Sequence, residues 1–140
     1  MYTAGQPGTQ RCLQELEDLT QRVDGDLARH FAAEGIHYVQ FAFRWVNCML
    51  IRELPFDVSV RLWDTYLAEG MHFSEFLPYA CAAFLLSWSP RLKGMDFQDM
   101  ILFLQKTPTA AWRQADIEAV LSQAYMLRTS FGDAQTHLGL

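Results

Sequence analysis

The sequence predicts an all-α domain, and three observations lead to that fold class. Apolar residues recur at steps of three and four over most of the chain, which is the spacing of one helix face. No segment alternates apolar and polar residues for long enough to form a strand. Glycine or proline separates the periodic segments, at Gly35, Pro55, Gly70, Gly94 and Pro108. We therefore expect about six helices in one domain.

The first predicted helix follows the loop of residues 7–9, where Thr9 can serve as the N-cap. Its apolar face runs from residue 13 to residue 31. Gly25 weakens the helix midway, at about 1 kcal/mol relative to alanine. The face consists of Leu13, Leu16, Leu19, Val23, Leu27 and Phe31.

The second predicted helix, at residues 36–54, is apolar around most of its circumference, so we expect it to be central and buried. One narrow stripe is polar and consists of His37, Gln40, Arg44 and Asn47. An ionised Arg44 on a buried helix needs a carboxylate or several carbonyl groups as partners, because an unpaired buried charge is costly.

Pro55 ends the second helix, since the residue before a proline disfavours the α conformation. Asp57 can cap a third helix. In that helix Val60, Trp63 and Leu67 share a face, flanked by Leu62 and Tyr66. Gly70 is expected to end it.

Three further helices complete the prediction. Ser74 can cap the fourth helix, and Pro78 is tolerated there because it falls in or near the first turn. Asp96 and Asp99 give the fifth helix an acidic first turn. The sixth contains residues 117–127, and the tail from Ser130 is expected to fray. We assign residues 1–133 to the domain and residues 134–140 to a flexible tail.

Composition indicates which classes of partner to expect. The chain has 140 residues, of which 51% are hydrophobic, with four Trp and ten Phe. This is more apolar material than one small domain needs, so some of it is expected to face another chain or a missing part of this one. A net charge of −5 argues against nucleic acid as a partner, and no basic cluster suits a membrane surface.

Other features point to a cytosolic protein. The first residues lack the basic and apolar regions of a signal peptide. The strongly apolar stretch at residues 79–88 is too short to span a bilayer. Cys12, Cys48 and Cys81 are scattered and odd in number, which is typical of reduced, buried thiols.

No complete catalytic site, metal site or cofactor motif is evident in the sequence. His30, His37, His72 and His137 are dispersed, and no C-x-x-C or H-x-x-x-H spacing occurs. The D-G-D string at residues 24–26 lacks the remaining ligands of a calcium loop. No glycine-rich phosphate loop or G-x-S-x-G elbow is present.

One ordered series of motifs is more informative. Residues 40–45, 52–55 and 61–66 read Q-F-A-F-R-W, R-E-L-P and R-L-W-D-T-Y, and residues 108–112 read P-T-A-A-W. An opening Y-T-x-x-Q-P-G at residues 2–8 and an A-A-F-L at residues 82–85 accompany them. Taken together, they closely resemble the C-terminal half of a TBC domain, the all-helical module of Rab GTPase-activating proteins. The pattern is most similar to the Golgi-associated branch of that family.

The resemblance implies a function. Members of the family insert an arginine finger and a glutamine finger into a Rab-type GTPase, and an arginine finger contributes about 10³–10⁵ in rate. Both fingers belong to the N-terminal half, which this sequence does not contain. The resemblance therefore implies a regulator fragment in vesicle trafficking, not itself a hydrolase and inactive alone. Its partners would be a Rab GTPase and the missing half, and its location cytoplasmic, peripheral at Golgi membranes.

Two strings look like the fingers, and we reject both. Residues 23–29 match I-x-x-D-x-x-R if valine replaces isoleucine, which would make Arg29 the finger. Residues 38–40 match Y-x-Q with Gln40. Neither string leads into the segment that follows it in the family, a Thr-containing loop or a glycine. Gln40 is instead expected to be a buried hydrogen-bonding group.

The motif residues themselves have structural interpretations. We expect the charged ones to pair where helices cross, and Trp45 and Trp63 to anchor the packing. The alternative function is a non-catalytic helical interaction module, and self-association of the fragment is expected if apolar surface is uncovered. The charged residues are Arg44, Arg52, Glu53, Arg61 and Asp64.

Overall fold

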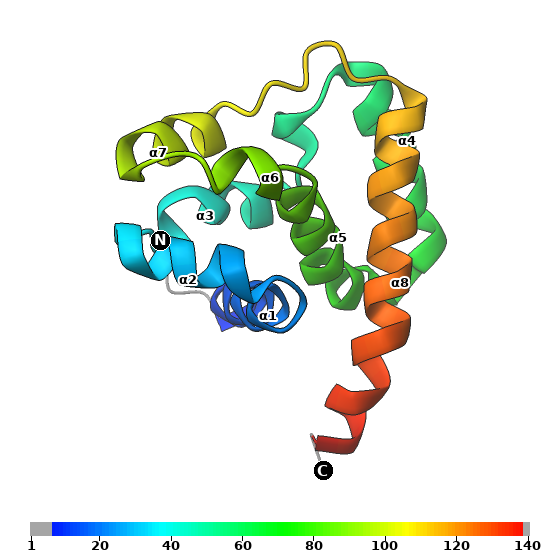
Figure 1. The fold of residues 1–140 in the computed structure, drawn as a ribbon. Coiled ribbons are helices and arrows are strands. Elements are labelled where there is room, and N and C mark those ends of the chain that lie inside the picture. Colours follow the sequence, from blue (N-terminus) through cyan, green and yellow to red (C-terminus); the bar gives the residue numbers. More distant parts are fainter. Residues whose placement is uncertain (1–6, 139–140) are drawn as a thin grey trace.

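The structure is a computed structural model that describes residues 7–138, and it confirms the all-α fold class (Figure 1). Within this range the chain forms eight α-helices and two 3₁₀ helices, with no strand. The opening motif of residues 2–8 lies mostly outside the described range. The elements are α1 (Pro7–Val23), α2 (Gly25–Glu34), α3 (Val39–Asn47), η1 (Ile51–Glu53), α4 (Phe56–Glu69), η2 (Gly70–His72), α5 (Phe73–Ser87), α6 (Ser89–Leu92), α7 (Phe97–Gln105) and α8 (Gln114–Leu138).

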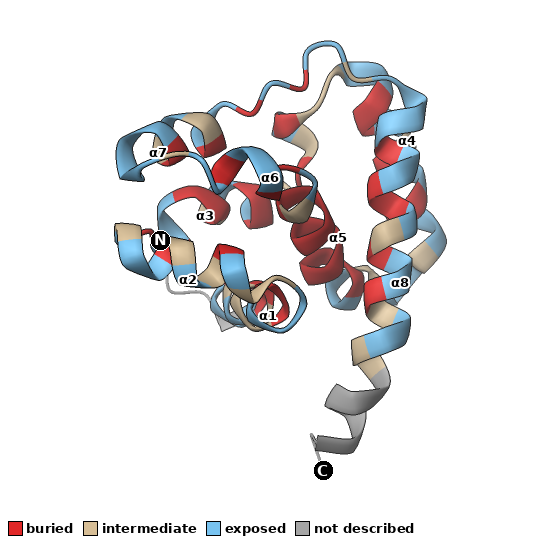
Figure 2. Ribbon diagram, in the orientation of Figure 1, coloured by how far each residue is buried: buried red, intermediate tan, exposed pale blue. Residues whose placement is uncertain are grey.

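The centre of the fold is α5, which packs chiefly against α8 and α1. Its residues 76–85 are all buried, and Figure 2 shows them as a continuous buried stretch. Pro78 lies beyond the first turn, because the helix begins at Phe73 and not after Ser74 as predicted. The helix therefore contains one position that donates no backbone hydrogen bond.

The first predicted helix is two helices, α1 and α2. The chain breaks at Asp24, whose carboxylate accepts a hydrogen bond from the Leu27 N–H at 3.1 Å and so caps α2. Side-chain capping satisfies a donor that a continuous helix would have bonded to its own backbone. The apolar face continues across the break, because Leu16, Leu19, Leu27 and Phe31 are all buried.

The second predicted helix is shorter than expected. α3 ends at Asn47, and Met49 and Leu50 then adopt left-handed backbone conformations with φ of 53° and 66°. The Leu50 N–H bonds the Trp45 carbonyl at 2.8 Å, and the Leu50 side chain is buried. This turn brings η1 back alongside α3 and so places Glu53 beside Arg44.

α4 has two apolar faces, and one of them packs on the protein. Val58, Leu62 and Tyr66 are buried, whereas Trp63 and Leu67 are exposed. Val60, Trp63 and Leu67 share a face as the spacing predicts, but that face is exposed, and a second apolar stripe on the opposite side of the helix packs on the protein. Asp57 lies in the first turn and is not the N-cap, which is Pro55.

The remaining helix ends agree in part with the sequence. Gly70 ends α4 with φ of 61°, and Asp96 caps α7 by accepting from the Asp99 N–H at 2.9 Å. The last helix continues to Leu138, so the backbone is helical where a frayed tail was expected from Ser130. None of the described helices is long and apolar enough to cross a membrane.

Candidate functional site

Three of the sequence motifs meet at one polar node beside α3. Arg44 donates from Nε to Glu53 Oε2 at 2.9 Å and from Nη2 to Glu53 Oε1 at 3.3 Å. Arg44 Nη2 also donates to the Gln105 carbonyl at 2.6 Å. Thr109 donates from its hydroxyl to the Glu53 carbonyl. The F-R-W, R-E-L-P and P-T-x-x-W segments are therefore bonded to one another.

The two charges of this node differ in their surroundings. The Glu53 side chain is 2% exposed, whereas that of Arg44 is 45% exposed. A carboxylate so deeply buried is stable only when it is paired and hydrogen-bonded, and Arg44 supplies a two-point ion pair. The node holds α3, η1 and the chain after α7 in one arrangement.

Aromatic side chains connect Trp45 and Trp112, two tryptophans of the sequence motifs, to the core. Trp45 is completely buried and meets Phe84 edge to face, with ring centroids 5.0 Å apart. Phe84 in turn meets Trp88 and Trp112, and these two indoles stack at 5.4 Å. Such geometry stabilises by about 0.5–1.5 kcal/mol per pair beyond burial. Trp45 thus lies at the core as expected.

A second set of charges fixes α4 to α8. Arg61 donates to both oxygens of Glu118, at 2.5 and 3.3 Å, and to the Thr65 hydroxyl at 2.6 Å. Arg128 donates to both oxygens of Glu69, at 2.7 and 3.4 Å. Sequence reasoning missed Glu69, Glu118 and Arg128, because partners 57 and 59 residues apart leave no local signal.

The other motif residues are not paired as expected. Arg52 and Asp64 are exposed, and neither forms an ion pair within the part of the chain that the structure describes. Trp63 is 44% exposed and meets Tyr66 edge to face at 6.3 Å, so its expected role as a core anchor was wrong. It lies on the outward side of α4, away from Leu62.

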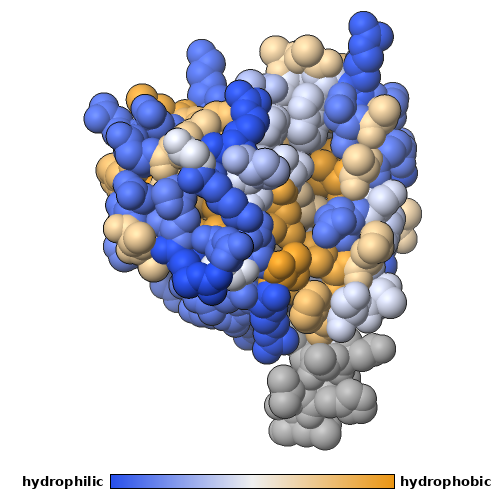
Figure 3. All heavy atoms as spheres, viewed as in Figure 1, coloured by the Kyte–Doolittle hydropathy of each residue, from blue (hydrophilic) through white to orange (hydrophobic). Residues whose placement is uncertain are grey.

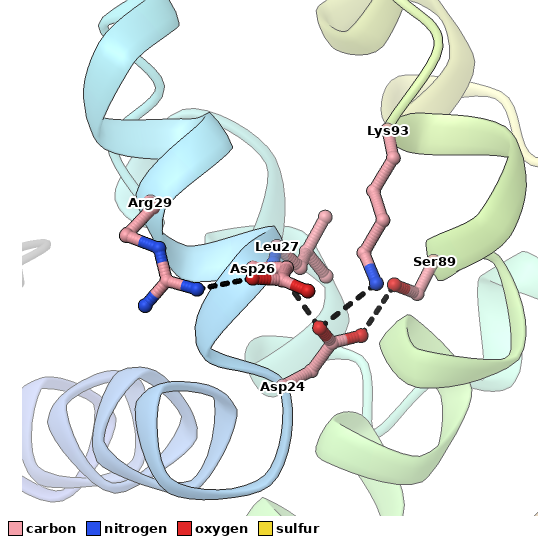
Figure 4. Close-up of polar contacts among 6 residues, drawn as sticks. All are labelled: Asp24, Asp26, Leu27, Arg29, Ser89 and Lys93. Atoms are coloured by element: carbon pink, nitrogen blue, oxygen red, sulfur yellow. Dashed lines mark hydrogen bonds and ion pairs between the residues drawn. The ribbon is translucent and has the colours of Figure 1, made fainter.

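Figure 4 shows the surroundings of the first finger-like string. Arg29 is exposed and forms an ion pair with Asp26 of the same helix. Asp24 instead accepts from Ser89 Oγ at 2.5 Å and from Lys93 Nζ at 3.0 Å, which joins α2 to α6. Burial opposes the ionisation of Asp24, but the hydrogen bonds from Ser89, Lys93 and the Leu27 N–H outweigh it and hold its pKa below the ordinary value.

Gln40, from the second string, is exposed, so the expectation that it is buried was wrong. α3 begins at Val39, which places Gln40 in its first turn, where its side-chain oxygen accepts from the His37 N–H at 2.8 Å. This bond satisfies a donor at the helix start. Both finger-like strings therefore have local structural roles.

The outward side of α4 exposes a row of large apolar side chains. Four large side chains line its outward side, and Met71 continues the line into η2. Part of the line opens onto a cavity of about 210 Å³ among Met49, Tyr66 and Phe73. We call this surface the α4 outer face, and it consists of Phe56, Val60, Trp63, Leu67 and Met71.

Two further hollows lie on the surface, and Phe56 and Val60 of the α4 outer face line the first of them. A groove of about 1100 Å³ separates the start of α4 from residues 110–115. A furrow of about 520 Å³ between α5 and α8 has Trp88 and Trp112 in its wall, and Figure 3 shows hydrophobic side chains gathered there. Among the described residues no group of His, Cys, Asp and Glu is placed to hold a metal ion.

Comparison with known proteins gives consistent results. The family model of the Rab-GTPase-TBC domain matches residues 1–93. The chain is 47% identical to the GTPase-activating protein gyp1 of Schizosaccharomyces pombe, over 98% of this chain and 27% of that protein. It is likewise 47% identical to TBC1 domain family member 22A of Homo sapiens, over 97% of this chain and 26% of that protein.

A solved structure agrees with both relatives. The crystal structure of the Ypt/Rab-GAP domain of Gyp1p matches with a TM-score of 0.88 at 46% identity, over 93% of this chain and 40% of that chain. The chain spans about a quarter of the length of the curated relatives named above. The chain therefore belongs to the Rab-GTPase-TBC domain family and corresponds to the C-terminal half of such a domain.

Proposed function

We propose that this chain supports the binding and activation of a Rab-type GTPase within a larger TBC domain and supplies neither catalytic finger. It acts as part of a GTPase regulator and is not itself a hydrolase. The observation that carries the proposal is the local engagement of Arg29 and Gln40. One is paired with Asp26 and the other bonds the start of α3.

The surroundings of Arg29 also support the proposal. A catalytic arginine acts by reaching the transferring phosphoryl group, and it must be held toward the partner. Arg29 instead pairs with the carboxylate one turn earlier on its own helix. The rigid node of Arg44 and Glu53 fits a supporting role, since it connects three segments and leaves no hydrogen-bonding group of Glu53 free for substrate.

GTP turnover by a panel of Rab proteins tests the proposal. The isolated chain is expected to leave the hydrolysis rate of every Rab within about twofold of its intrinsic rate, against the 10³–10⁵-fold effect of an arginine finger. Arg29→Ala and Gln40→Ala are expected to change nothing. Saturable acceleration that either substitution abolishes would show that the strings are fingers after all.

A second candidate function is a non-catalytic interaction module, and the uncovered α4 outer face favours it. Such a module would bind its partner irrespective of nucleotide. A pull-down with Rab proteins loaded with GTP or GDP separates the candidates, because the first predicts preference for the GTP form. We further propose a cytoplasmic location, peripheral at Golgi membranes, and a role in vesicle trafficking, which microscopy of the tagged protein would test.

A further inference from the structure

The α4 outer face is apolar along the whole helix. Phe56, Val60, Trp63 and Leu67 follow one another at steps of four, three and four, so they form a single stripe. All four are exposed, from 44% for Val60 and Trp63 to 79% for Phe56. A contiguous stripe of this kind marks an interaction surface more often than exposed residues scattered singly.

The stripe has an acidic edge. Asp57 and Asp64 are seven residues apart, which places them on the same side of the helix. Both are exposed, and neither forms an ion pair within the described residues. Arg61, the nearest cation in sequence on α4, is already bound to Glu118 and Thr65. A partner with lysine or arginine beside an apolar stripe would complement both features of this surface.

The folding of this chain does not account for the stripe. The opposite side of α4 already buries Val58, Leu62 and Tyr66. Two ion pairs, from Arg61 and from Glu69, fix the helix to α8. The outer face forms neither of these ion pairs, and its one aromatic contact with the packed side is the edge-to-face pair of Trp63 with Tyr66.

We propose that the α4 outer face is where the rest of the TBC domain docks, through a helix with an apolar stripe and a basic edge. The inference rests on the proposed function, because it requires this chain to act inside the larger domain. The support for this occupant is the length of the related domain. The same fold is found in the Gyp1p Rab-GAP domain, of whose chain it makes up only 40%, so the remaining part must pack against some face of it.

A second copy of this chain is the less favourable occupant. In a two-fold dimer the same patch meets itself, so the acidic edges of both copies would approach one another. The net charge of −5 adds to this repulsion. A partner helix with a basic edge would replace this repulsion with attraction.

A chimera tests the docking. The matching segment of Schizosaccharomyces pombe gyp1 is replaced by this chain, and two substitutions are compared, Leu67→Lys and Met126→Lys. Leu67 on α4 and Met126 on α8 are each 64% exposed, so they are matched controls. In the chain alone, both substitutions are expected to shift Tm by less than about 3 °C, as surface changes do.

In the chimera the two substitutions are expected to differ. Leu67→Lys should lower Tm by about 5–10 °C, because it places a charge in a buried apolar contact. It should also slow Rab GTP turnover about tenfold through loss of the docked arrangement, the equivalent of roughly 1.4 kcal/mol. Met126→Lys should change neither. Equal effects of Leu67→Lys and Met126→Lys on Tm would overturn the docking proposal.

GTP turnover by the chimera tests the proposed function, and the Tm difference between the two variants tests the docking. A folded chimera that accelerates no Rab would contradict the proposed function, while the Tm difference between the two variants still decides the docking. If the unsubstituted chimera does not fold, the same pair of substitutions at the aligned positions of full-length gyp1 gives the same comparison without a graft.

Discussion

α4 and α5 are both rich in apolar residues, yet this chain covers them differently. Every residue of α5 from 76 to 85 is buried between α1 and α8. α4 buries Val58, Leu62 and Tyr66 but exposes Phe56 and Leu67. The apolar content of a helix indicates how much of its surface is buried in the complete fold. Whether that surface is buried within this chain depends on which helices of the chain pack against it.

The two helices also use their charges differently. α5 has no charged residue after Glu75 and depends on close packing. α4 is tied to α8 by Arg61 with Glu118 and by Glu69 with Arg128. Substitutions that separate packing, ion pairing and exposure therefore test the comparison.

The largest expected effect comes from the α5 side. Phe84→Ala should lower the free energy of unfolding by about 3–5 kcal/mol, because it leaves a cavity among Trp45, Trp88 and Trp112. Denaturant unfolding followed by fluorescence measures it. A loss below about 1 kcal/mol would mean that α5 is not the packing centre.

The buried ion pair should give the next effect. Glu53→Gln should cost about 1.5–3 kcal/mol, the range for hydrogen bonds to charged groups. Glu118→Gln is the control, because the Glu118 side chain is 49% exposed and a pair of this kind contributes about 0–1 kcal/mol. Equal losses in the same unfolding assay would contradict the difference in burial.

Acidification should weaken the link between α2 and α6 by about 1 kcal/mol, the usual size of a helix-cap effect. The folded-state pKa of Asp24 lies below its ordinary value of 3.8, so the carboxylate stabilises the fold above that pH. The contribution disappears as pH falls through the lowered pKa. The stability gap between the native chain and Asp24→Asn should therefore be widest near pH 6 and close toward pH 2. A stability gap that does not change with pH would show that the charge of the Asp24 carboxylate does not contribute to stability.

The smallest effect is expected at the α4 outer face of the isolated chain. Trp63→Ser should change the free energy of unfolding by less than about 0.5 kcal/mol, despite the loss of a tryptophan. It should also reduce self-association, since it removes exposed apolar surface. Light scattering measures the association. A loss of several kcal/mol would place Trp63 in the core.

Sequence reasoning succeeded where a signal is local. Gly70 and Asp96 mark helix ends that the structure confirms, because a glycine that adopts positive φ and a capping aspartate act within one turn. It failed for Trp63 on α4, because two apolar stripes share that helix and periodicity cannot choose between them. It also missed the break at Asp24, because capping there outweighed the continuity of the apolar face.

The site was predictable only in part, because most of its contacts join residues far apart in the sequence. The need of Arg44 for a carboxylate followed from its position among apolar residues, and Glu53 meets that need. That Thr109 joins the same node depends on a contact across 56 residues. The left-handed turn at Met49 and Leu50, which places Glu53, carries neither glycine nor asparagine to signal it.

Thiol labelling tests the central claim most directly, namely that the α4 outer face is covered in the whole domain. Leu67→Cys and Met126→Cys are compared in the chain alone and in the chimera, with Cys48→Ser throughout. Cys12 and Cys81 are buried, and burial raises the pKa of Cys12 to about 12, so both react slowly with maleimide.

We predict that both introduced cysteines react rapidly in the chain alone, because both positions are 64% exposed. In the chimera only the cysteine at position 67 should become protected. Equal labelling rates at positions 67 and 126 in the chimera would contradict the account.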